Sequence, residues 1–140
     1  AFKNNELNKD FIAVLPFQGP AHKGMPELHQ LTPTLTILQK KGFRVALVTD
    51  GRMSGASGKV PAATHMSPEA SKGGSIGKIK TGDLLTLNCI DGTLTCHESD
   101  FEQRATVNKE STDQIGLGRE LFGVFRRQVT DSEQGACTLF

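Results

Sequence analysis

The hydrophobic pattern of the first fifty residues predicts two strands. Residues 11–15 form an apolar run that Pro16 ends, and residues 45–48 form a continuous apolar run within a second predicted strand, residues 43–49. A continuous run of this length is typical of a strand that is covered on both faces. The second strand leads directly into residues 51–58, a loop with three glycines and two serines. We therefore expect a buried strand that presents a polar loop.

A helix is predicted between these two strands. Thr32 and Pro33 indicate its start, because a threonine oxygen can cap the first turn and proline already has helical backbone geometry. Gly42 is the expected end, since glycine readily takes the left-handed conformation that closes many helices. The order of strand, helix and strand predicts an α/β fold with helices against a sheet. The apolar face of the helix consists of leucines spaced at i, i+4 and i+7, namely Leu31, Leu35 and Leu38.

The pattern after the loop is weaker, with one exception. Residues 83–90 and 93–97 flank Asp91 and Gly92, a strong hairpin signal, and apolar and polar side chains alternate along the first of the two segments. The other elements are expected to be short or interrupted by glycine. They are a short helix at residues 67–74, a strand at 76–79, a strand at 104–108 and a helix over 112–129.

Composition places the chain among ordinary globular domains. Its 140 residues suffice for one domain with a substantial core. Residues 1–10 are mostly polar and are expected to be a linker or a truncated element, which leaves residues 11–140 as the domain. Sixteen basic and fifteen acidic residues give a net charge of +1, so neither nucleic acid nor a membrane is indicated as a partner. No apolar run approaches the roughly 20 residues of a membrane span, and we expect a cytoplasmic protein.

The cysteines indicate neither a disulfide framework nor a metal site built from this chain alone. Cys89, Cys96 and Cys137 are odd in number and lack CxxC spacing. The simplest interpretation is that they are small hydrophobic side chains in the core.

The glycine-rich loop resembles a phosphate-binding P-loop, but its spacing is wrong. That motif needs glycine at the position of Met53, and serine or threonine directly after Lys59, where Val60 stands. A nucleoside triphosphate site is therefore not expected. The ordinary alternative is a tight connection that is rich in glycine for steric reasons.

Two further groups are candidates for chemistry. Glu27, with His29 two residues later, lies in a predicted loop and is a candidate ligand for a cation, although most loop glutamates are simply solvated. His65 and Glu69 are four residues apart and could place an imidazole near a carboxylate. A cap-and-turn cluster at the start of a short helix is the more common arrangement.

Several short motifs follow one another along the chain. They are Gly24-Met-Pro-Glu27, Thr49-Asp-Gly-Arg-Met-Ser-Gly-Ala56, His65-Met-Ser-Pro-Glu-Ala70, Gly73-Gly74 and Gly82-Asp83. Together, over residues 11–140, they resemble the C-terminal domain of the dihydroxy-acid and phosphogluconate dehydratases. The tail from Gly118 to Gln128 and from Gly135 to Phe140 is similar to the phosphogluconate branch in particular. Gln18 and Met53 favour the same branch, because the dihydroxy-acid branch usually has glutamate and often phenylalanine there.

The resemblance implies a fold and a reaction. The implied fold is an α/β domain with a mixed, partly closed, barrel-like β-sheet flanked by helices, a swivelling β/β/α-type domain. The implied reaction is the dehydration of 6-phospho-D-gluconate to 2-dehydro-3-deoxy-6-phosphogluconate, a step of the Entner-Doudoroff pathway. Another sugar acid or a branched-chain dihydroxy acid is the alternative substrate. A non-catalytic module that binds an anion is the alternative from another class.

The resemblance also implies roles for individual residues. Ser54 is implied as the base that removes the proton from C2, and Glu27 as a ligand of a divalent cation, typically magnesium. Arg52, Lys59 and His65 are candidates for binding the anionic substrate. Members of the family also use an iron–sulfur cluster, expected to be 4Fe-4S, as a Lewis acid on the departing hydroxyl.

The cluster cysteines of the family lie in a larger N-terminal domain, and the three cysteines of this chain match none of them by context. The chain is therefore expected to supply half of an active site, with its own N-terminal domain as a partner, and to be inactive alone. Related enzymes imply a homodimer.

Overall fold

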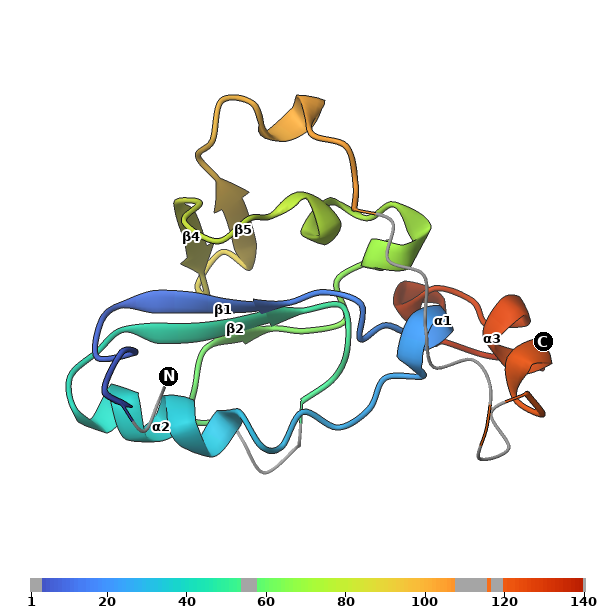
Figure 1. Cartoon of the computed structure of the whole chain (residues 1–140), viewed down its shortest axis with the longest axis horizontal. Coiled ribbons are helices and arrows are strands. Elements are labelled where there is room, and N and C mark those ends of the chain that lie inside the picture. Colours follow the sequence, from blue (N-terminus) through green and yellow to red (C-terminus); the bar gives the residue numbers. More distant parts are fainter. Residues whose placement is uncertain (1–3, 54–57, 108–115, 117–119, 140) are drawn as a thin grey trace.

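A small parallel sheet with helical segments on both faces forms the centre of the molecule (Figure 1). The computed structural model describes residues 4–53, 58–107, 116 and 120–139. The sheet has the strand order β1-β2-β3, and β2 is buried at all five positions, as the continuous apolar run predicts. Both predicted strands are confirmed. The strands are β1 (Phe11–Leu15), β2 (Val45–Thr49) and β3 (Ala62–Ala63).

The predicted helix is confirmed as α2 (Thr32–Lys40), which covers one face of the sheet. Its two central leucines are 0% exposed, and burial of such side chains contributes roughly 1.5–3 kcal/mol each. This half of the core consists of Leu35, Leu38, Val45, Leu47 and Val60.

The two ends of α2 differ in how well the sequence predicts them. Gly42 has the expected positive φ, 96°. The predicted threonine cap is wrong, because the capping residue is Leu31 and the Thr32 hydroxyl donates a hydrogen bond to the carbonyl of His29 (3.3 Å). Thr32 is buried, so its hydroxyl is satisfied by the preceding loop instead of the first helical turn.

Two 3-10 helices cover the other face of the sheet. They are η3 (Ala70–Lys72), which lies within the short helix predicted over residues 67–74, and η4 (Ser75–Lys78). The predicted start at residue 67 is wrong, because the capping residue of η3 is Glu69. The strand predicted over residues 76–79 is wrong, because a helical turn buries Ile76 against the sheet. The buried residues of this second half of the core are Phe17, Val48, Ala70 and Ile76.

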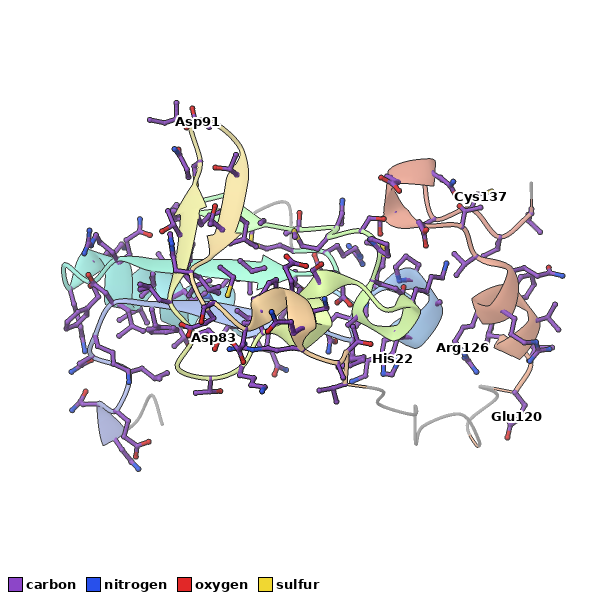
Figure 2. All side chains as sticks on the ribbon, turned by 90° about the horizontal axis from the view of Figure 1, so that it is seen from above. His22, Asp83, Asp91, Glu120, Arg126 and Cys137 are labelled. Atoms are coloured by element: carbon purple, nitrogen blue, oxygen red, sulfur yellow. The ribbon has the colours of Figure 1, made fainter. Side chains whose placement is uncertain are left out.

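The predicted hairpin is confirmed as a separate antiparallel pair, β4 (Leu85–Asn88) and β5 (Thr93–Cys96). Its tip, which carries Asp91, points away from the body of the molecule (Figure 2). Leu94 of β5 packs against the second half of the core and attaches the hairpin to the sheet.

Two short helices, α1 (Pro20–Lys23) and α3 (Gly123–Gln128), pack together at one end of the molecule (Figure 1). A third turn, η6 (Ser132–Gln134), follows them. The helix predicted over 112–129 is shorter among the described residues, where it begins at Gly123; residues 112–115 and 117–119 lie outside the described part. Leu121, which precedes this helix by two residues, is 72% exposed.

The α/β class is confirmed, while the finer prediction of one partly closed, barrel-like sheet is not. The strands of the described residues form one three-stranded parallel sheet and one two-stranded antiparallel sheet, and neither is closed. The two sheets stay separate because the hairpin contacts the core through side chains such as Leu94 instead of pairing with a strand edge. None of the helices within the described ranges has the length and apolar character needed to cross a membrane.

The strand predicted at 104–108 is wrong over its described part, residues 104–107, because the side chain of Arg104 organises this segment differently. Its Nη1 lies 2.5 Å from Asp83 Oδ2, and its Nη2 lies 2.8 Å from Asp100 Oδ1. The Arg104 and Asp83 side chains are only 9% and 8% exposed. The hydrogen bond from Arg104, followed by that from the Lys80 backbone, holds the pKa of Asp83 below its usual value.

We expect Arg104→Gln to lower the free energy of unfolding at neutral pH. We also expect this variant to lose less of its remaining stability than the parent when the pH is lowered. Because the folded state lowers the pKa of Asp83, this carboxylate stabilises the fold fully above about pH 4, its unfolded pKa, and less as the pH falls through the folded pKa. Urea unfolding at several pH values between 7 and 3 measures the effect. The matched control is Arg44→Gln, which removes a more exposed pair with Asp10 and should change stability less. Equal losses for the two variants would contradict the prediction.

Candidate functional site

Asp50 is the centre of the carboxyl edge of the sheet, where the segments after the strands meet. It directly follows β2 and is 0% exposed. Its Oδ2 accepts hydrogen bonds from the backbone N–H of Phe17 (3.0 Å) and of Ala70 (2.9 Å), and its Oδ1 accepts one from Gln18 (2.8 Å). A buried carboxylate is stable only when such donors replace water. Asp50 therefore joins the segment after β1 to the first turn of η3.

Glu69 is a second buried carboxylate, 3% exposed, and it holds α1. Its Oε2 accepts a hydrogen bond from the N–H of Ala21 (2.8 Å), its Oε1 accepts one from His22 (3.0 Å), and the Ser71 hydroxyl donates to it as well. Both its oxygens are thus occupied by the chain itself. The predicted possibility that Glu69 pairs with the imidazole of His65 has no support in these contacts.

Two glycines allow these segments to approach closely. A Cβ atom on Gly19 would lie 2.3 Å from Glu69 Oε2, and one on Gly51 would lie 2.6 Å from the Cβ of Gln18. No side chain fits at these distances. The glycines are required by packing and not by backbone flexibility.

The structure brings two of the predicted site residues together. Glu27 and Arg52 form an isolated parallel backbone bridge, and Arg52 Nε donates a hydrogen bond to the carbonyl of Met25 (2.8 Å). Both Glu27 and Arg52 are exposed, so their side chains can meet a ligand at this edge. The motif that ends at Glu27 and the motif that contains Arg52 are thereby joined.

His65 lies at the same edge, and Lys59 lies at the other end of the sheet. The backbone N–H of His65 donates to the carbonyl of Gly51 (2.9 Å), which places the exposed His65 next to the Arg52 segment. Lys59 precedes β3, and its carbonyl accepts a hydrogen bond from Gln39 (2.9 Å) in the last turn of α2. Lys59 is therefore apart from the other candidates. Ser54 lies outside the described residues.

The described residues do not form a site for an iron–sulfur cluster. Cys89 is exposed, whereas Cys96 and Cys137 are partly buried, which corrects the interpretation of all three as core residues. Cys137 lies at the opposite end of the molecule from the hairpin tip at Asp91 (Figure 2). Over the described ranges, His, Cys, Asp and Glu form no group of three or more that could hold a metal ion.

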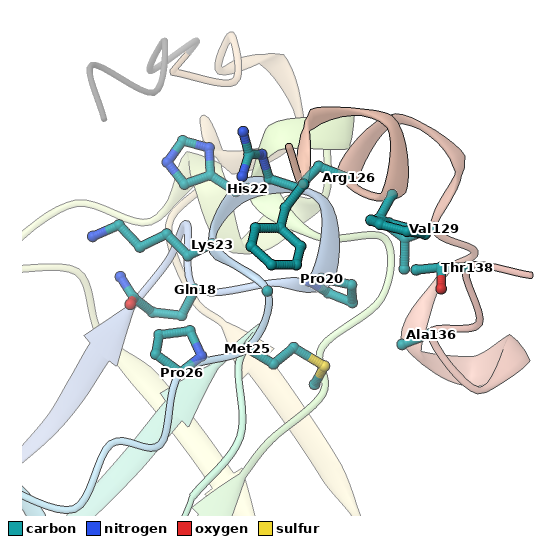
Figure 3. A pocket seen from close by; sticks show the side chains of 13 residues that line it. Gln18, Pro20, His22, Lys23, Met25, Pro26, Arg126, Val129, Ala136 and Thr138 are labelled. Carbon is teal, nitrogen blue, oxygen red and sulfur yellow. The ribbon is translucent and has the colours of Figure 1, made fainter. Parts of the chain in front are cut away.

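A pocket of about 750 Å³ lies beside this edge, between α1 and α3 (Figure 3). Met25 and Pro26, which directly precede Glu27, form part of its wall. Phe125 and Val129 contribute apolar surface from the C-terminal segment. The pocket and the Glu27–Arg52 bridge thus share the loop after α1.

Comparison with known proteins identifies the family. The family model described as dihydroxy-acid/6-phosphogluconate dehydratase C-terminal matches residues 1–136. The chain belongs to this family. The resemblance drawn from the short motifs is thereby confirmed.

Dehydratases from several organisms are similar to this chain over nearly its whole length. A phosphogluconate dehydratase from Helicobacter pylori is 54% identical over 96% of the chain, and one from Pseudomonas aeruginosa is 49% identical over 99%. A dihydroxy-acid dehydratase from Methanosphaera stadtmanae is 34% identical over 97%. The chain spans about 23% of the length of the two phosphogluconate dehydratases.

Sequence reasoning missed the two carboxylates that build this edge of the dehydratase domain. Asp50 carries one available signal, since an acidic residue directly after a fully buried strand has to find donors near the core. Its three partners are backbone N–H groups of Phe17, Gln18 and Ala70, which no side-chain motif reveals. For Glu69 the sequence suggests only a pairing with His65 or a cap-and-turn cluster at the start of a short helix.

We expect Asp50→Asn to lower the free energy of unfolding by about 2–4 kcal/mol, because an amide NH₂ then faces a backbone N–H in a buried site. Urea unfolding monitored by circular dichroism measures the change. Glu133→Gln removes the same charge from an exposed position and should leave stability within about 0.5 kcal/mol of the parent. An Asp50→Asn variant as stable as this control would show that the three hydrogen bonds do not hold the edge.

Proposed function

We propose that this chain is the C-terminal domain, over residues 11–140, of a phosphogluconate dehydratase that converts 6-phospho-D-gluconate to 2-dehydro-3-deoxy-6-phosphogluconate. The family match supports a dehydratase, and the relatives named phosphogluconate dehydratase are 44–54% identical, against 34% for the dihydroxy-acid dehydratase. This difference favours the phosphorylated sugar acid over a branched-chain dihydroxy acid.

The observation that carries the proposal is the backbone bridge between Glu27 and Arg52. It joins two family motifs that lie about 25 residues apart and brings the backbones of two exposed charged residues, Glu27 and Arg52, together at the carboxyl edge of the sheet. Open α/β sheets commonly bind ligands at this edge. A sugar acid presents a carboxylate and hydroxyls, which a guanidinium and a cation held by a carboxylate can recognise.

In the proposed reaction Ser54, two residues after Arg52, accepts the proton from C2. The C2–H electrons form the C2–C3 double bond while the C3–O bond breaks, and the departing hydroxide takes up a proton from solvent and leaves as water. Ser54 returns its proton to solvent, and the resulting enol tautomerises to the 2-keto acid. A serine hydroxyl is a weak base, so this role needs a positive charge nearby that stabilises the alkoxide. Arg52 is the proposed contact for the substrate carboxylate, with His65 at the same edge. Lys59, which lies at the other end of the sheet, stays a prediction from the sequence.

Glu27 fits one ligand position of a divalent cation, proposed to be Mg²⁺. Its carboxylate is exposed at the edge, and carboxylate oxygens are ligands that hard cations prefer. Such a cation, when bound, would supply the positive charge that stabilises an alkoxide. The remaining ligands would come from substrate, water or another part of the protein.

An iron–sulfur cluster does not fit the described residues of this chain. We propose that its ligands lie in an N-terminal domain of the longer protein, in line with the 23% of the relatives' length that this chain spans. A swivelling, barrel-like domain and a homodimer remain predictions from the resemblance, and a cytoplasmic location remains a prediction from the composition.

We expect Ser54→Ala in the complete enzyme to lower kcat on 6-phospho-D-gluconate by about 10²–10⁴-fold, because the general base is lost. Cluster absorbance and thermal stability should not change. The control is Ser75→Ala, which removes the hydroxyl of an exposed serine in η4 and should keep full turnover. Near-normal turnover of Ser54→Ala would rule out its role as the base, and a substrate preference for a dihydroxy acid would contradict the proposed reaction.

We expect Glu27→Gln to raise the Mg²⁺ concentration needed for half-maximal activity at least about tenfold, because a neutral amide is a weaker ligand for a hard cation. Titration of the metal-depleted complete enzyme with MgCl₂ measures this concentration. The control Glu133→Gln should match the parent. An unchanged Mg²⁺ dependence would remove Glu27 from the metal site.

A further inference from the structure

The pocket between α1 and α3 has a marked charge character. Among the described residues that line it there are two permanent cations, Lys23 and Arg126, and one histidine, His22, but neither aspartate nor glutamate. Asp131, two residues after the lining residue Val129, is neutralised by Lys72, whose Nζ lies 2.7 Å from Asp131 Oδ1. The charged side chains that line the pocket are therefore all cationic among the described residues, and the nearby Glu69 carboxylate is held by backbone N–H groups of α1.

The polar side chains of the pocket come from two distant parts of the chain. Gln18, His22 and Lys23 belong to α1 and the segment before it, whereas Arg126 belongs to α3. Figure 3 shows the Arg126 guanidinium beside the His22 ring, and the two also lie close together in Figure 2. Gln18 and Lys23 extend from the same wall of the pocket (Figure 3).

The position of α1 in this wall is fixed by strong contacts. Glu69 accepts hydrogen bonds from two of its N–H groups, and His22 is only 9% exposed with its ring 5.2 Å from that of Phe17. The backbone of α1, which carries Lys23, is therefore held in place before any ligand arrives. A backbone that is already ordered lowers the entropic cost of binding a ligand such as an anion.

We propose that this pocket binds the phosphate group of the phosphorylated sugar acid, with Lys23 and Arg126 as the charged contacts. The inference rests on the proposed function and extends it to the part of the substrate that does not react. A guanidinium matches the geometry of phosphate oxygens, and a lysine adds a second charge against the dianion. Met25 and Pro26 of the pocket wall directly precede Glu27, so the proposed phosphate contacts and the carboxyl edge share one loop.

The test compares two substrates in the complete enzyme. For Lys23→Gln and for Arg126→Gln, we expect the ratio of kcat/KM on 6-phospho-D-gluconate to kcat/KM on D-gluconate to fall about tenfold or more, the effect of one lost charged hydrogen bond. Arg126→Lys should recover part of the ratio. Arg127→Gln, which removes the same charge from the next residue of α3 outside the pocket, should leave the ratio unchanged.

The outcomes separate this inference from the proposed function. An unchanged ratio of the two kcat/KM values in both pocket variants would overturn the phosphate site. This includes the case in which activity falls equally on the two substrates, as expected if the pocket is an interface with another part of the protein. If the parent enzyme does not dehydrate 6-phospho-D-gluconate, the proposed function fails, and binding of inorganic phosphate followed by ³¹P NMR decides about the pocket. The site is supported if the parent and Arg127→Gln broaden the phosphate resonance and the Lys23→Gln/Arg126→Gln double variant does not. Equal broadening of the phosphate resonance by all three proteins overturns the site.

Discussion

The buried carboxylate of Asp50 is the interaction on which the functional edge of this domain depends. An ionised group that is 0% exposed destabilises a fold unless strong donors replace its hydration. Here the donors are the backbone N–H groups of Phe17, Gln18 and Ala70. These donors belong to segments that are remote in sequence. The Asp50 side chain therefore fixes both the segment after β1 and the turn η3, which covers the face of the sheet opposite to α2.

Asp50 and Glu69 hold successive parts of the chain in place. Asp50 positions the segment that follows β1, and Glu69 positions the helix α1 at the end of that segment, through hydrogen bonds to Ala21 and His22. The close approach of Gly19 to Glu69, where a Cβ atom would lie 2.3 Å from the carboxylate oxygen, shows how little space this arrangement leaves. The exposed residues of the edge, Glu27 and Arg52, thus follow closely on segments that these two carboxylates hold in place, and binding and catalytic residues need such support.

The sequence predicted the elements whose signals are local. The apolar run of β2, the leucine spacing and terminal Gly42 of α2, and the hairpin around Asp91 need no distant partner to be recognised. Other predictions failed where distant contacts decide the local structure. Ile76 lies in a 3-10 turn because its side chain packs there against Val48 and Phe17. Residues 104–107 do not form a strand because the Arg104 side chain pairs with Asp83 and Asp100. In the same way, Glu27 and Arg52 were found as candidates from their motifs, but only the fold shows that they are neighbours, and Asp50 was missed because its partners are backbone groups.

The loop from Gly24 to Glu27 connects the two halves of the proposed substrate site. Gly24 reverses the chain after α1 with a φ of 71°, the Met25 carbonyl holds Arg52, and Glu27 pairs with the Arg52 backbone. Met25 and Pro26 at the same time line the cationic pocket. A phosphorylated sugar acid carries an anionic group at each end and reacts near only one of them. On the proposed function, the same loop therefore sets the separation between the phosphate contacts and the reacting carbons, and its attachment through Glu69 and Asp50 makes that separation a property of the folded core.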